Sequence, residues 1–287
     1  MSAAAGAAQG DAAFCADLVR AQDFDHYAAT LFVGPEPRRA LLALYAFNVE
    51  IVRVRDQVSQ PLPGEIRLQW WSDMLAGQGH GGVEGNPVAA ELQRAIARYA
   101  LPAAPLSRLI EAHIFDLYND PMPDRAALEL YLAETSSALL AQAARVLGPA
   151  SDATDHLAHH AGLATGASRL LAGFPRDAAR QQMFLPADLL AQAAADPEDA
   201  FAGKLTPALR AALDQFVEEA RAHLDQALTL LGEVPRAIRP ALLPLALAQR
   251  DFKQMARPDG DVLQPRPRSH LATLWTLWRA SRSAAFR

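Results

Sequence analysis

The chain has little of the chemistry on which several protein classes depend. Cys15 is its only cysteine, which excludes an internal disulfide framework and a zinc site built on cysteines. No apolar run reaches the roughly 18 residues of a membrane-spanning helix, so no span is predicted. The net charge is −5 and the basic residues are scattered, so nucleic acid is not an expected partner.

The first residues also lack the parts of a secretory signal. Residues 1–10 are rich in Ala and Gly, with neither a basic region nor an apolar one. No signal peptide is predicted there, and residues 1–12 are expected to be disordered. A cytoplasmic location is the expectation that follows.

Strand signals are scarce, and helix formers dominate. Ala, Leu, Arg, Glu and Gln recur, and apolar residues fall at helical spacing, as in Leu41, Leu44, Tyr45 and Val49. We predict an all-α protein with one domain over residues 13–257. A proline-containing linker at 258–267 and an amphipathic helix should complete residues 258–287. Pro and Gly divide the chain into helices expected near 11–20, 35–58, 65–76, 88–100, 104–119, 124–147, 151–172, 187–195, 206–231, 236–256 and 270–283.

Two short segments each carry half of an acidic pattern. Asp56 lies four residues after Val52, and Asp177 lies four residues after Gly173. A complete Asp-x-x-x-Asp pair stacks two carboxylates on one helical face, where they can ligate Mg²⁺. Two such helices facing across a cavity would bracket a diphosphate, and an apolar cavity would hold prenyl tails. The two half patterns point to diphosphate chemistry only through the family that the surrounding stretches resemble.

Three stretches around these half patterns resemble the squalene/phytoene synthase family over roughly residues 20–255. They are residues 35–47, Gln69-Trp70-Trp71, and residues 162–186, which end in Met-Phe-Leu-Pro. The resemblance implies an isoprenoid-synthase-like helical bundle around a central cavity, and a Mg²⁺-dependent prenyltransferase acting on isoprenyl diphosphates. In active members both aspartate pairs are complete. Here Val52 and Gly173 stand at the first positions, and Gln182 replaces the family's arginine.

Further segments resemble the complex I assembly factor branch of this family. They are residues 47–50, 56–59, 67–71, 86–89 and 134–137. The resemblance implies a pseudoenzyme with eroded aspartate motifs that acts in respiratory complex I assembly, peripherally at the inner membrane. Complex I assembly intermediates would then be the partners, and no cofactor is expected.

The neighbours of the two aspartates favour structural roles over catalysis. Arg53 lies three residues before Asp56, which is suitable spacing for an ion pair on a helix. Gly173 and Pro175 are predicted to end their helix before Asp177, which would remove that carboxylate from the cavity. If the protein is active, Asp56 and Asp177 are the expected Mg²⁺ ligands. Glu50 is a relocated ligand in the same alternative.

Other candidate sites are less specific. A set of arginines could together bind an anion or a diphosphate, although salt bridges are the favoured interpretation. The set consists of Arg38, Arg39, Arg169, Arg176 and Arg180. His156 and His160 have the spacing for a transition metal, but no further ligand is apparent. Trp275 and Trp278 lie on one face of the last predicted helix, beside arginines. This helix is expected to dock on the bundle, and a peripheral membrane contact through the two tryptophans is the alternative.

Three hypotheses remain. The favoured one is a non-catalytic synthase fold acting in complex I assembly. The second is an active head-to-head prenyltransferase of the phytoene or squalene synthase type. The third is a prenyl-lipid binder, whose partner would be an isoprenoid lipid held in a cavity that has lost its metals.

Overall fold

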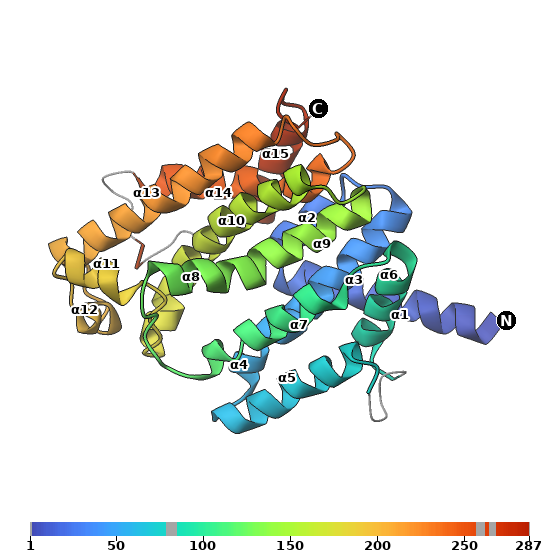
Figure 1. Ribbon diagram of the computed structural model, residues 1–287, viewed down its shortest axis with the longest axis horizontal. Coiled ribbons are helices and arrows are strands. Elements are labelled where there is room, and N and C mark those ends of the chain that lie inside the picture. Colours follow the sequence, from blue (N-terminus) through green and yellow to red (C-terminus); the bar gives the residue numbers. More distant parts are fainter. Residues whose placement is uncertain (1, 79–84, 257–261, 264–267, 287) are drawn as a thin grey trace.

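The computed structural model describes residues 2–78, 85–256, 262–263 and 268–286, and side chains from Ala8 onward. Helices form the architecture, and no strand occurs within these ranges (Figure 1). None of the helices described there combines the length and apolar composition needed to cross a bilayer. The predicted all-α fold class is confirmed.

The helices follow one another with short connections. In the first half they are α1 (Ser2–Gln22), α2 (Phe24–Thr30), α3 (Pro35–Val52), α4 (Val54–Gln57), α5 (Pro61–Leu75), α6 (Pro87–Tyr99), α7 (Ala103–Ala112), the 3₁₀ turn η1 (Phe115–Leu117), α8 (Arg125–Leu132), the π-helical turn η2 (Ala133–Ser137) and α9 (Ala138–Leu147). The second half contains α10 (Asp152–Ala179), α11 (Ala187–Gln192), α12 (Pro197–Phe201), α13 (Pro207–Leu230), the 3₁₀ turn η3 (Arg239–Leu242), α14 (Pro244–Met255) and α15 (His270–Ser281).

Side-chain caps explain where several helices begin. Asn86 accepts hydrogen bonds from the backbone N–H groups of Val88 and Ala89 at the start of α6. Ser151 and Thr206 cap α10 and α13 in the same way. These caps satisfy N–H groups that have no partner within the first helical turn.

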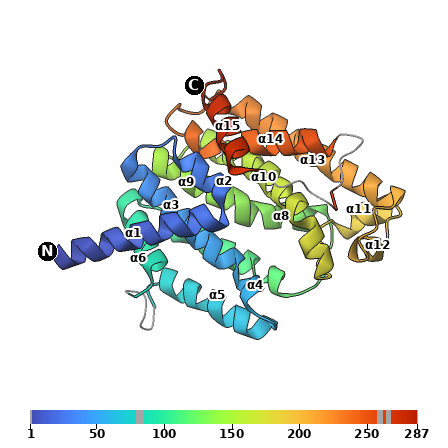
Figure 2. The same ribbon diagram turned by 180° about the vertical axis from the view of Figure 1, so that it is seen from behind.

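Two helices form the centre of the bundle. In α3, Ala40 to Val49 are all buried, so this helix is apolar on every side. The long helix α10 packs against α13, α9, α14 and η2. Figures 1 and 2 show α13, α14 and α15 on one side of this centre and α5 on the opposite edge. The central helices are therefore positioned to carry side chains into the interior of the molecule.

Helix α10 and the turn η2 approach each other unusually closely. A Cβ atom on Gly162 would lie 2.2 Å from the Cα of Ser137, a distance that only glycine permits. The Ser137 hydroxyl donates a hydrogen bond to the carbonyl of His159 at 2.8 Å. The extra residue of the π turn thus occurs where two walls of the bundle meet, as π turns often do at functional sites.

Several boundaries differ from the sequence-based expectations. The first helix starts at Ser2 rather than at residue 11, so helical backbone covers most of the segment expected to be disordered. The helix expected at 35–58 is interrupted at Arg53, and that expected at 151–172 continues to Ala179. Most of the predicted linker at 258–267 lies outside the described residues. The proposed division at 12 and 257 stays a prediction.

Candidate functional site

A cavity of about 170 Å³ lies between α3, α4, η1, α8, η2 and α10, and it collects most of the predicted site residues. Its wall contains four arginines, three aspartates and a set of apolar side chains. The lining residues are Asn48, Val52, Arg55, Asp56, His113, Asp116, Tyr131, Leu132, Thr135, Ser136, Leu139, Gly166, Arg169, Leu170, Arg176, Asp177, Arg180, Gln182 and Phe184.

The first half pattern spans a break between two helices. Val52 ends α3 and Asp56 lies in α4, with Arg53 at the junction. Asp56 forms an ion pair with Arg180, the residue that follows the end of α10. The predicted pairing of Asp56 with Arg53 is therefore wrong, because the break removes the regular helical spacing between them.

The second half pattern lies on a continuous helix, contrary to the expectation. Helix α10 runs through Pro175, so Gly173 and Asp177 are one turn apart on the same helix. A helix interior tolerates proline poorly, but here the buried neighbours Phe174 and Ala178 hold the turn in the core. Asp177 consequently faces the interior and lines the cavity.

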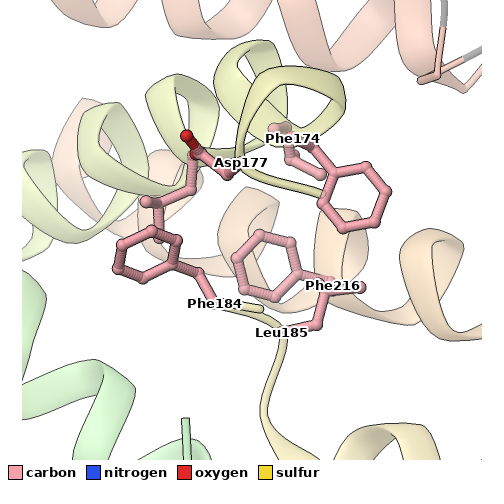
Figure 3. A pocket seen from close by; sticks show the side chains of 7 residues that line it. Phe174, Asp177, Phe184, Leu185 and Phe216 are labelled. Carbon is pink, nitrogen blue, oxygen red and sulfur yellow. The ribbon is translucent and has the colours of Figure 1, made fainter. Parts of the chain in front are cut away.

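Burial and an arginine act in opposite directions on Asp177. Burial raises the pKa of this carboxyl above its usual 3.8, while Arg176 favours the ionised form. The Nε of Arg176 donates to Oδ1 of Asp177 at 3.1 Å. Asp177 also borders a small apolar pocket with Phe174, Phe184, Leu185 and Phe216 (Figure 3).

These residues fit a magnesium ion poorly. Val52 and Gly173 offer no side-chain oxygen, and Mg²⁺ requires near-octahedral oxygen ligation. The two carboxylates that remain are each paired with an arginine. Across the described ranges, no group of three or more His, Cys, Asp or Glu residues is arranged to hold a metal.

The five candidate anion-binding arginines divide into two groups. Arg169, Arg176 and Arg180 line the cavity together. Arg38 lies over the ring of Tyr27, and Arg39 makes two hydrogen bonds of 2.7 Å to the buried Glu91, so neither lines the cavity. The spacing of arginines in sequence did not distinguish these groups.

Arg169 is held in place by Asp23 and His26 at the start of α2. Its Nη2 lies 3.2 Å from Oδ2 of Asp23, and the same oxygen lies 2.7 Å from Nδ1 of His26. Burial opposes ionisation of Asp23, but Arg169 and His26 outweigh it and hold the pKa of Asp23 well below its usual value. Burial lowers the pKa of His26. Asp23 therefore stays charged and fixes Arg169 at the cavity wall.

A hydrogen-bonded group of three side chains forms another part of the wall. The Nδ1 of His113 lies 2.6 Å from Asp116, and the hydroxyl of Tyr131 donates to the same carboxylate at 2.9 Å. Burial, then Asp116, raises the pKa of Tyr131. Tyr131 was missed, although it precedes Thr135 by one turn on the same helical face.

Two buried nitrogen atoms in the cavity wall have no hydrogen-bond partner. They are Nε2 of Gln182 and Nε of Arg55. Gln182 is only 3% exposed, so its amide is turned away from bulk solvent. Donors of this kind are costly to leave unmatched, and they are suited to an anionic or carbonyl oxygen.

The predicted histidine pair lies away from this cavity and has a third member. His160 Nε2 is 3.2 Å from Nε2 of His156, and its Nδ1 is 2.9 Å from Nδ1 of His223. Burial, followed by the neighbouring histidines, lowers the pKa of His160 from 6.5 to about 4. Within the described ranges, this cluster does not form a group of side chains arranged to hold a metal.

Trp275 and Trp278, for which membrane contact was the alternative to docking on the bundle, lie on α15 and are exposed. They stack on each other with ring centroids 5.0 Å apart. Leu277 faces the opposite way and is fully buried. The helix thus docks on the bundle by one face and leaves its tryptophan face uncovered.

Comparison with known proteins places this geometry in context. The squalene/phytoene synthase family model matches residues 19–275. The chain is 31% identical over 252 residues to NADH dehydrogenase (ubiquinone) complex I, assembly factor 6, of Rattus norvegicus, covering 88% of this chain and 76% of the relative. It is 29% identical over 243 residues to phytoene synthase 1, chloroplastic, of Arabidopsis thaliana, covering 81% and 57%.

A solved structure shows the same architecture. The chain superimposes on a dehydrosqualene synthase crystallised with a ligand, with a TM-score of 0.84 and 14% identity, covering 96% of both chains. That likeness supports the isoprenoid-synthase-like helical bundle expected from the sequence. Together with the match over most of the chain, it shows that this protein belongs to the squalene/phytoene synthase family.

Proposed function

We propose that this protein acts in the assembly of respiratory complex I and does not carry out prenyl transfer. The observation that carries the proposal is the state of the two acidic patterns. Val52 and Gly173 provide no ligand, while Asp56 and Asp177 are each held by an arginine. The positions that would collect magnesium ions are therefore occupied by internal ion pairs.

The chemistry of prenyl diphosphates explains why this loss matters. The departing pyrophosphate must be neutralised as it leaves, and bound Mg²⁺ ions supply that charge in the reaction type the fold supports. The three aspartates of the cavity wall offset part of the positive charge of its four arginines. We infer that the wall binds anions but does not provide the concentrated charge that ionisation requires.

The relatives support the assembly role. Proteins of rat, mouse and human that carry the name complex I assembly factor 6 are 29–31% identical to this chain over 88% of its length. Complex I assembly intermediates are the partners we propose, and no cofactor is needed for this role. We further propose that the protein works peripherally at the inner membrane.

Binding of a prenyl lipid is a second candidate, favoured by one observation. The unmatched Gln182 and Arg55 donors lie in the same cavity as Leu132, Leu139 and Phe184. A ligand with an anionic head and an apolar chain matches both sides of that wall. Native mass spectrometry of protein purified from its host should then detect an isoprenoid, and Gln182→Leu should reduce its occupancy.

Gene disruption tests the assembly role directly. Loss of the gene should lower the amount of complex I on native gels and reduce NADH-driven respiration. Complementation with Asp56→Ala should restore both, because the proposal gives that carboxylate no catalytic part. Normal complex I in the disrupted strain, or failure of a folded Asp56→Ala protein to complement, would contradict the proposal.

A further inference from the structure

One helix exposes an apolar stripe that the fold leaves uncovered. Leu271, Trp275 and Trp278 lie at helical spacing on α15 and are 79%, 59% and 43% exposed. We call these three residues the outer face of α15. The other tryptophans, Trp70 and Trp71, are partly buried and buried. Isolated exposed apolar residues are ordinary, but three in one stripe with two stacked indoles are not.

The rest of α15 shows that this exposure is not caused by loose docking. Leu277 and Thr273 are buried against α2 and α14, where Leu277 joins a core with Leu243 and Leu247. Arg250 of α14 donates to the Thr276 hydroxyl at 3.0 Å. The helix is fixed by one apolar side and carries a second apolar side outward.

The charged residues of α15 and of the segment after it have one sign. Between Ser269 and Phe286 there is no Asp or Glu, although the whole chain has a net charge of −5. Arg279 and Arg282 are exposed, and the Arg282 guanidinium lies 5.1 Å from the ring centroid of Trp278. The acids nearest the start of α15, Asp25 and Asp251, are both paired with Arg268.

We propose that the outer face of α15 docks on an anionic lipid bilayer. Tryptophan and leucine would enter the boundary between headgroups and acyl chains, and Arg279 and Arg282 would contact lipid phosphates. The helix lies parallel to the membrane surface in this arrangement. The inference deepens the membrane location within the proposed function, but its structural basis is α15 alone.

Vesicle co-sedimentation of the purified full chain tests this surface. The protein should bind vesicles of phosphatidylcholine with phosphatidylglycerol more tightly than phosphatidylcholine alone, and salt should weaken the binding. Trp275→Ser with Trp278→Ser should reduce the affinity roughly tenfold or more, since each indole buries a large apolar area. The matched control is Leu62→Ser with Ile66→Ser, an exposed apolar pair on α5, which should leave binding unchanged.

A second variant keeps the test valid if the double serine protein does not fold. Arg279→Glu with Arg282→Glu retains the indoles and should abolish the preference for phosphatidylglycerol vesicles. The control, Arg20→Glu with Arg236→Glu, makes the same charge change elsewhere and should keep that preference. No binding to either vesicle, or equal binding by wild type and both α15 variants, would overturn the proposal. Self-association that depends on Trp275 and Trp278 without vesicle binding would assign the face to a protein instead. A wild-type protein that binds neither vesicle, in a host where gene disruption still lowers complex I, would refute this surface while leaving the assembly role intact.

Discussion

The contact between Gly162 and Ser137 allows a sharp prediction about stability. A Cβ atom at position 162 would lie 2.2 Å from the Cα and 2.3 Å from the backbone N of Ser137. These are backbone atoms inside the core, so they cannot move aside as a flexible side chain would. Gly162→Ala must therefore push α10 and η2 apart.

The expected magnitude follows from two opposing effects. Overpacking of a well-packed core costs about 1–3 kcal/mol, and backbone displacement places this case at about 3 kcal/mol or above. Alanine gains about 1 kcal/mol over glycine from helix propensity. The net loss in the free energy of unfolding should be about 2 kcal/mol or more.

Gly166→Ala provides a matched control one turn further along α10. Its Cβ would lie 2.7 Å from the side-chain ends of Leu132 and Ser136, which can rotate away. The packing cost and the propensity gain should then nearly cancel. Urea unfolding, monitored by circular dichroism, gives the stability of both variants from the urea concentration at the midpoint, provided that the dependence of the free energy on urea is unchanged. A Gly162→Ala midpoint equal to that of Gly166→Ala would refute the reasoning.

Two further substitutions test the ion-pair and histidine assignments. Arg39→Ala should destabilise the protein by about 2 kcal/mol in urea unfolding. This is less than the roughly 3–5 kcal/mol expected for a buried charge left fully unpaired, because Arg94 still contacts Glu91. A loss of stability smaller than about 0.5 kcal/mol would contradict this assignment. The pKa of His160 is about 4 in the folded protein and 6.5 in an unfolded chain. Between these two pH values the imidazole is protonated only in the unfolded chain. The free energy of unfolding should therefore fall as the pH drops from 6.5 to about 4. His160→Gln should reduce this fall, and an unchanged pH dependence would show that His160 is not responsible.

The fold class and the positions of the two half patterns could be obtained from the sequence because both depend on local features. Periodicity indicates the helices, and the family motifs are enough to locate Val52, Asp56, Gly173 and Asp177 in the sequence. The position of Asp177 within α10 was mispredicted because proline and glycine are local helix breakers, whereas core packing around Phe174 is a tertiary effect.

The partners of the charged groups could not be predicted from spacing. Asp56 pairs with Arg180, which is 124 residues away in the chain, in preference to Arg53 on the adjoining turn. Tyr131 and Gln182 likewise acquire their roles only when α8, α10 and the segment after α10 meet at the cavity. Long-range contacts of this kind are decided by the packing of whole helices.

Pyrophosphate release distinguishes a dismantled magnesium site from one that still ionises prenyl diphosphates. Purified protein would be incubated with Mg²⁺ and farnesyl or geranylgeranyl diphosphate, beside an active dehydrosqualene synthase in the same buffer. We expect no release above the rate without protein, and no change on Asp56→Ala. Release above that rate which Asp56→Ala abolishes would contradict it and would show that this cavity still performs prenyl chemistry.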